Sequence, residues 1–204
     1  MEMLIDRFVV QLPNDFTPVP SRPGDTTGSV SFMKQTENSA ILAMYCQIPS
    51  EQAMPFNSVD QVIKGVRGVL APDQGIIEIK AGGTGRGRRF IYSIIKTMNR
   101  GAVQGVQYIL TMHIGYYADY VFQAQVFCDE SGLTGARDTS IFEILRYDGK
   151  IGANGEGWVA DPYDPTYMQG ALMNLSEKEE YDEAFPNHPL SQARKIVKFL
   201  IENN

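Results

Sequence analysis

Two neighbouring segments in the middle of the chain alternate between apolar and other side chains over their whole length. In the first segment, one face carries Val106, Tyr108, Leu110, Met112 and Ile114. In the second, Ala118–Cys128, the same spacing gives Tyr120, Phe122, Ala124, Val126 and Cys128, with Asp119, Gln123 and Gln125 on the other face. A period of two is typical of a β-strand with one buried face. The short connection leaves no room for a crossover, so these strands are predicted to be antiparallel neighbours.

Four further strands are predicted from β-branched and aromatic residues bounded by turn residues. They are Arg7–Leu12, Val30–Met33, Ala40–Gln47 and Phe90–Met98. The stretch Thr17–Gly28 contains three prolines and two glycines, and it is predicted to be a loop.

Two helices are predicted within the first 147 residues. Apolar residues recur at helical spacing over Ser58–Leu70, and Ser58 with Gln61 fits a capping box. A second helix is predicted to begin at Asp138 or Thr139 and to turn three residues inward, namely Ile141, Ile144 and Leu145. Strands, helix, strands and helix in this order predict an α+β fold, a largely antiparallel β-sheet covered by helices.

The last quarter of the chain differs from the rest in charge. Residues 151–204 contain nine acids and four bases, whereas the first 150 contain 15 and 14. A glycine-rich connection, 148–157, therefore separates a domain of residues 1–147 from an acidic C-terminal extension, 158–204. The extension is predicted to contain a short helix from Ser176, ending before Pro186, and a last helix from Pro189. We expect both helices to dock on the domain; binding of a partner, or of the other copy in a homodimer, is the alternative.

The order of elements over about residues 5–147 resembles the PsbP-like fold, shared by the photosystem extrinsic subunit PsbP and a small Ran-binding protein. The matching features are a first strand ending in Leu12-Pro13, an early hairpin, the Ser58–Leu70 helix, a meander and a closing helix. The resemblance implies an α/β/α sandwich and a role that is mostly non-catalytic. Residues 161–200 resemble a tail found in uncharacterised bacterial proteins. Neither resemblance transfers a functional residue, because fold-level similarity does not supply a site.

Several classes of function are disfavoured by composition. A net charge of −6 argues against nucleic-acid binding, and no apolar run is long enough to cross a membrane. A basic stretch followed by an apolar core is missing at the N-terminus, so we expect no signal peptide and a cytoplasmic protein. His113 and His188 lack an evident metal-binding partner, and no nucleophile motif surrounds Cys46 or Cys128. The sequence therefore predicts no catalytic residue, no metal and no cofactor.

Two groups of residues are candidates for binding a partner. The glycine-rich string Ala81–Arg89 contains Arg86, Arg88 and Arg89; it is either a hairpin loop with solvated arginines or a site for an anion or acidic partner. The extension contributes Trp158, Tyr163 and Tyr167. Arginine and aromatic residues are enriched at protein interfaces. We therefore expect a non-enzymatic protein-binding or accessory module; an immunity-type factor is one example of this class. The alternative is an enzyme or small-molecule binder that holds an anionic ligand near Arg86–Arg89.

Overall fold

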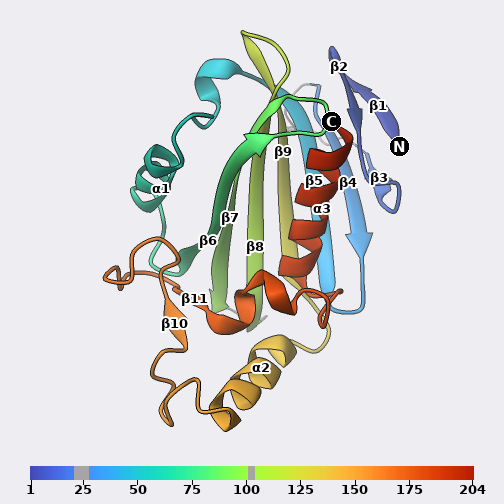
Figure 1. Ribbon diagram of the computed structural model, residues 1–204. Coiled ribbons are helices and arrows are strands. Elements are labelled where there is room, and N and C mark those ends of the chain that lie inside the picture. Colours follow the sequence, from blue (N-terminus) through green and yellow to red (C-terminus); the bar gives the residue numbers. More distant parts are fainter. Residues whose placement is uncertain (21–27, 101–103) are drawn as a thin grey trace.

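The computed structural model describes residues 1–20, 28–100 and 104–204. A seven-stranded antiparallel sheet forms its centre, in the order β3-β4-β5-β9-β8-β7-β6 (Figure 1). Its strands are β3 (Thr17–Val19), β4 (Val30–Gln35), β5 (Ser39–Pro49), β6 (Gln74–Gly83), β7 (Arg89–Arg100), β8 (Gln104–Gly115) and β9 (Tyr120–Glu130). Helices lie on both faces of the sheet. The predicted α+β fold with a largely antiparallel sheet is therefore confirmed.

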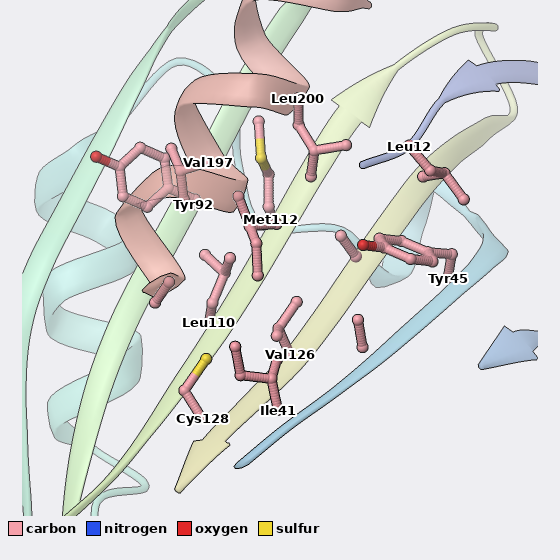
Figure 2. Packing of buried hydrophobic residues seen from close by; sticks show 14 of the residues in the cluster. Leu12, Ile41, Tyr45, Tyr92, Leu110, Met112, Val126, Cys128, Val197 and Leu200 are labelled. Carbon is pink, nitrogen blue, oxygen red and sulfur yellow. The ribbon is translucent and has the colours of Figure 1, made fainter. Parts of the chain in front are cut away.

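The helix α3 (Pro189–Asn203) crosses one face of the sheet and closes the main hydrophobic core (Figure 1). The alternating residues of β8 and β9 point to this helix, as their pattern predicts. In Figure 2, Val197 and Leu200 of α3 lie over Leu110 and Met112 of β8. The C-terminal extension is thus part of the same core as the sheet.

The N-terminal residues form a separate hairpin beside this core. Its strands are β1 (Glu2–Ile5) and β2 (Phe8–Gln11), and Ile5, Phe8 and Val10 enter the main core. The segment Thr17–Val19, predicted to be a loop, is instead strand β3 at the edge of the sheet. Its short length and Pro18 suit an edge strand, which needs only one hydrogen-bonded neighbour. Residues 21–27 of the predicted loop lie outside the described residues.

The helix α1 (Val59–Arg67) covers the opposite face, over β6 and β7. Its predicted start is confirmed, because the Ser58 hydroxyl accepts a hydrogen bond from the Gln61 amide at 3.3 Å. Val62 and Ile63 pack on Ile79 and other residues of the two strands. The strand β6 that they contact was missed in the sequence because its glycine-rich end does not alternate.

The helix α2 (Ala136–Tyr147) lies beyond one end of the sheet (Figure 1). Its N-cap is Gly135 in a left-handed conformation, three or four residues before the predicted caps Asp138 and Thr139. Ile141 and Leu145 are buried as predicted, whereas Ile144 is exposed.

Between α2 and α3 the chain follows the edge of the sheet in short elements. These are β10 (Val159–Ala160), β11 (Met173–Asn174) and the 3₁₀ turns η2 (Leu175–Glu177) and η3 (Glu179–Tyr181); a further turn, η1 (Ser50–Gln52), precedes α1. The predicted α-helix from Ser176 is wrong. Asn174 takes the N-cap position and Glu177 completes the capping box, so one short turn forms and ends at Lys178.

Candidate functional site

The turn between β6 and β7 is fixed against the end of α3. The amides of Gly85 and Arg86 donate hydrogen bonds to the carbonyls of Ile201 and Asn204, at 2.7 and 3.2 Å. A Cβ at Gly85 would lie 2.6 Å from the Glu202 carbonyl oxygen, so only glycine fits there. The loop therefore supplies donors to the carbonyl end of the helix, where positive charge is also favourable.

The three arginines of this turn have different surroundings. Arg88 stacks on Tyr116, with its guanidinium carbon 4.0 Å from the ring centre. Within the described chain its Nη1 is buried and has no hydrogen-bond partner. Arg89 lies 5.4 Å from the Phe56 ring centre and donates to the Asn57 side chain. Arg86 is exposed.

Aromatic rings continue from Arg88 onto the neighbouring turns. Tyr116 packs on Phe8 at 4.7 Å between ring centres, and the exposed Tyr117 also stacks on Phe8, at 5.6 Å. Arg7 lies over the ring of Tyr120 at 5.1 Å. We call this end of the molecule the arginine–tyrosine surface, defined by six residues: Arg7, Arg86, Arg88, Arg89, Tyr116 and Tyr117.

The charge of this surface is opposite to that of the whole chain. Its four arginines are accompanied by two acids in the same turns, Asp6 and Asp119. Burial raises the pKa of Tyr116, and Arg88 and Arg86 partly oppose that shift. A positively charged surface with stacked aromatic rings is suited to contact carboxylates.

The three aromatic residues of the extension lie in separate intramolecular contacts. The Tyr163 hydroxyl donates to the Ile79 carbonyl at 3.0 Å and accepts from the Ile79 amide, which covers the free edge of β6. Tyr167 stacks on Arg67 at 4.4 Å, and Trp158 meets Phe142 edge-on at 5.1 Å. These contacts hold the extension along the sheet edge and on α2.

A network of buried charged side chains lies between α2, α3 and the two 3₁₀ turns. The Arg137 side chain is fully buried, and it donates to Asp182, Ser191 and the Ser176 carbonyl at 2.9, 2.9 and 2.7 Å. Its remaining nitrogen donates to the Lys178 carbonyl at 3.0 Å. Every nitrogen of this guanidinium therefore has a partner.

The same network continues along α3 to the sheet. Arg194 donates to Asp182 at 3.1 Å, to the Glu177 carbonyl at 2.8 Å and to Glu78 at 3.2 Å. A bulge in β6 beside Ile77 turns Ile77 and Glu78 both toward α3, where Glu78 also accepts from Tyr92.

Glu177 forms the other end of the network. Its carboxylate accepts from Lys96 and Tyr108 at 2.8 Å each, and all three side chains are buried. Three cations, Arg137, Arg194 and Lys96, thus balance three carboxylates, Glu78, Glu177 and Asp182. These pairs fix the extension in place, and Glu78 also pairs with the more exposed Lys80 at 3.2 Å.

This network was not predicted from the sequence, although the spacing of its two arginines held a signal for it. Arg137 is four residues before the inward-facing Ile141, and Arg194 is four after Leu190. Both arginines therefore share the buried face of their helix. Their acidic partners could not be recognised in the same way. Asp182 and Glu177 lie in turns, where no helical spacing indicates which side chains are buried.

Both histidines are buried and hydrogen-bonded. Burial, Arg137 and Arg194 lower the pKa of His188 to about 3, and its Nδ1 accepts from the Leu190 amide as the N-cap of α3. His113 accepts from the Met54 amide at 3.0 Å and bonds Gln123, and burial lowers its pKa. Burial also raises the pKa of the Cys128 thiol, so this cysteine is unreactive.

The hollows beside the network are open grooves along α3. One of about 420 Å³ and one of about 250 Å³ share Glu179, Arg194 and Lys198 in their walls. Acids and bases alternate along both, so neither groove favours a ligand of one charge. Within residues 1–20, 28–100 and 104–204, no cluster of three His, Cys, Asp or Glu side chains could hold a metal ion.

Comparison with known proteins adds no family to this geometry. The chain matches no protein-family model, and a search of curated proteins finds no significant relative. In the described ranges, no helix combines the length and the apolar character needed to cross a bilayer.

Proposed function

We propose that this protein is a non-enzymatic protein-binding or accessory module that captures an acidic partner protein through the arginine–tyrosine surface. The observation that carries the proposal is the state of Arg88. Its Nη1 is buried and lacks a partner in the described residues, while Arg137 has all its nitrogens satisfied. Arg88 as a whole is only partly buried, so a small shift of its side chain on Tyr116 would let a carboxylate or phosphate supply the acceptor that Nη1 lacks.

Composition and rigidity support the same surface. Arginine and tyrosine are the residues that dominate binding energy at interfaces. The turn that carries Arg86 and Arg88 is anchored by two hydrogen bonds to α3, so its side chains are held before a partner arrives. A pre-ordered contact loses less entropy on binding than a loose loop does.

The resemblance to the PsbP-like fold is consistent with this proposal, since members of that fold are mostly non-catalytic. In this proposal the extension is held on the domain by Trp158, Tyr163 and Tyr167. Contact of these three side chains with a partner remains a prediction. A cytoplasmic location and a bacterial source are likewise expectations from the sequence.

A small anionic ligand is the second candidate for the same place. The unpartnered Nη1 of Arg88 would bind a free phosphate or carboxylate as well as a side chain of a protein. The two candidates differ in size: a small anion contacts Arg88 and its immediate neighbours, whereas a protein also covers Tyr117 and Arg7.

The test is capture of a partner from the native cell by the full-length chain. The variant Arg86→Glu/Arg88→Glu/Arg89→Glu is expected to reduce capture at least tenfold. The matched control, Lys64→Glu/Lys178→Glu/Lys195→Glu, changes the net charge equally at exposed positions elsewhere and is expected to keep capture. Full-length protein is needed because α3 lies in the core. Undiminished capture by the arginine variant would refute the proposal.

Tyr117→Ala separates the two candidates. A protein partner is expected to bind this variant at least fivefold more weakly, because the exposed ring is lost from its contact. Binding of inorganic phosphate, measured by calorimetry, is expected to be unaffected if Arg88 alone holds the anion.

A further inference from the structure

On the face of the sheet opposite α3, one apolar stripe runs across five strands in register. Its members are Met33, Leu42, Phe127, Ile109 and Ile95, which are direct neighbours from β4 to β7. Met33 is 53% and Leu42 39% exposed, and the other three are partly exposed. None of the five belongs to the three hydrophobic clusters of the fold. The stripe therefore lies outside those clusters, and only its end residue Ile95 borders one of them, as the cross-strand partner of Ile76.

The rows on either side of the stripe are almost without charge. One row consists of Gln35, Ala40, Asp129, Gln107 and Thr97, and the other of Ser31, Met44, Gln125, Thr111 and Ser93. Asp129 is the single charged residue among these positions, and the Gln107 amide donates to it at 2.8 Å. Charged residues are depleted at the centre of protein interfaces, and this face shows that depletion in a chain that is 21% charged.

Helix α1 does not extend over this region. Its apolar side chains pack on Ile76, Ile79 and Ile91, at the β6–β7 side of the sheet. In the described part of the chain, α1 is the only α-helix on this face, so β4, β5 and β9 have no helical cover there.

We propose that the stripe binds a second copy of this chain, so that two sheets pack face to face. Each copy carries a net charge of −6, and like charges repel unless the contact itself is neutral. The stripe region is neutral enough for two identical acidic chains to approach there. It shares no residue with the basic arginine–tyrosine surface, which an acidic partner would use.

The geometry of the stripe is self-complementary. A two-fold axis in the contact plane places the stripe of one copy on the stripe of the other. The axis can run along the stripe or cross it at Phe127. The central position of Phe127 means that it lies near the axis in either arrangement.

The area of the face sets the strength of this dimer. Five strands about 4.8 Å apart and about five residues of each strand, each rising about 3.4 Å, cover roughly 400 Å² per copy, or about 800 Å² in total. Stable dimers bury more, and this value belongs with transient interfaces. We therefore expect a reversible dimer with a dissociation constant in the micromolar range.

Sedimentation velocity over a range of concentrations tests the proposal. The wild-type chain is expected to shift from 22.7 kDa toward twice that mass as its concentration rises from about 1 to about 500 μM. Leu42→Lys and Met33→Lys place a charge on an exposed stripe position and are expected to weaken the dimer at least tenfold. The control Tyr147→Lys changes a side chain that is 92% exposed on α2 and is expected to leave it intact. A wild-type chain that stays at 22.7 kDa, or a dimer that both stripe variants retain, would overturn the proposal.

Cross-linking identifies the axis independently of charge. Phe127→Cys places a thiol near the two-fold axis; because packed sheets lie about 10 Å apart, too far for a direct disulfide, a short bis-maleimide is expected to link two copies. Tyr147→Cys controls for chance collisions and is expected to remain mostly monomeric, because α2 lies away from the stripe. The native Cys46 and Cys128 are buried. Equal cross-linking of the two variants would assign the dimer, if present, to another surface.

Discussion

The two arginine-rich regions of this molecule use the same side chain in opposite ways. Beneath α3, Arg137 and Arg194 are buried and donate to Asp182, Glu78 and backbone carbonyls until their nitrogens are satisfied. At the arginine–tyrosine surface, Arg86 is exposed and Arg88 keeps a buried nitrogen without a partner in the described chain. Arginine content alone therefore says little about function. Burial with complete hydrogen bonding marks the structural arginines Arg137 and Arg194, whereas exposure of Arg86 beside the incompletely bonded Arg88 marks the candidate binding surface; Arg67, whose Nε also lacks a partner in the described chain, is held by Asp161 and Tyr167.

The largest effect on stability is expected at Arg137. Arg137→Ala leaves Asp182, Ser191 and two buried carbonyls short of a donor, so the free energy of unfolding should fall by about 3–5 kcal/mol. Urea unfolding followed by circular dichroism measures this change. Arg146→Ala is the control on the same helix, because its exposed ion pair with Glu143 should contribute below about 1 kcal/mol. Similar losses for the two variants would show that the network does not stabilise the fold.

Arg137 also illustrates which features of the fold can be predicted from the sequence and which cannot. Local patterns predicted the alternating strands β8 and β9, the Ser58 cap and the apolar stripe of α3, because each depends on residues close in the chain. The buried ion network was not predicted, since its partners come from three distant segments. The strand β6 was missed for a related reason: a bulge and three glycines interrupt its alternation.

The candidate site was predicted in part. The position of Arg86, Arg88 and Arg89 near a hairpin tip follows from the glycines around them. The tip's attachment to α3 and its stacking on Tyr116 depend on long-range packing, which no local pattern encodes. For the same reason the sequence could not show that Arg137 and Arg194 are fully hydrogen-bonded while Arg88 is not.

The paired region should also respond to pH through His188. Its pKa is about 3 in the folded protein and about 6.5 when unfolded, so the unfolded chain binds the proton first as the pH falls. The contribution of neutral His188 is complete above pH 6.5 and is lost progressively toward pH 3. Between pH 7 and pH 5 the free energy of unfolding should fall by about 2 kcal/mol from this group.

Comparison with His188→Asn isolates that contribution. Asparagine also serves as an N-cap, so the variant should fold while losing the titrating group. Arg137, Arg194 and Tyr108 face His188, and burial raises the pKa of Tyr108 well above this pH range. His113 and Glu130 titrate in both proteins and cancel in the difference. An equal pH dependence in wild type and variant would contradict the expected role of His188.

A smaller effect is expected where the extension covers the sheet edge. Tyr163→Phe removes the hydroxyl that bonds both backbone groups of Ile79, which should cost about 1 kcal/mol. Hydrogen exchange of the Ile79 amide should accelerate more than that of amides in β8, because only the edge loses a partner. Tyr147→Phe, at an exposed position of α2, is the control. An unchanged Ile79 exchange rate would mean that another group protects this edge.

The smallest effect on stability, and the largest on binding, is expected at the arginine–tyrosine surface. Arg86 is exposed, so Arg86→Ala should change the free energy of unfolding by no more than about 0.5 kcal/mol. Partner capture should nevertheless weaken, since the substitution removes a charge from the basic contact. Measuring stability and capture on the same variants, Arg86→Ala beside Arg137→Ala, tests the distinction between the two regions directly. A loss of stability at Arg86 comparable to that at Arg137 would assign the exposed arginine a structural role, and the division by hydrogen-bond completeness would then fail.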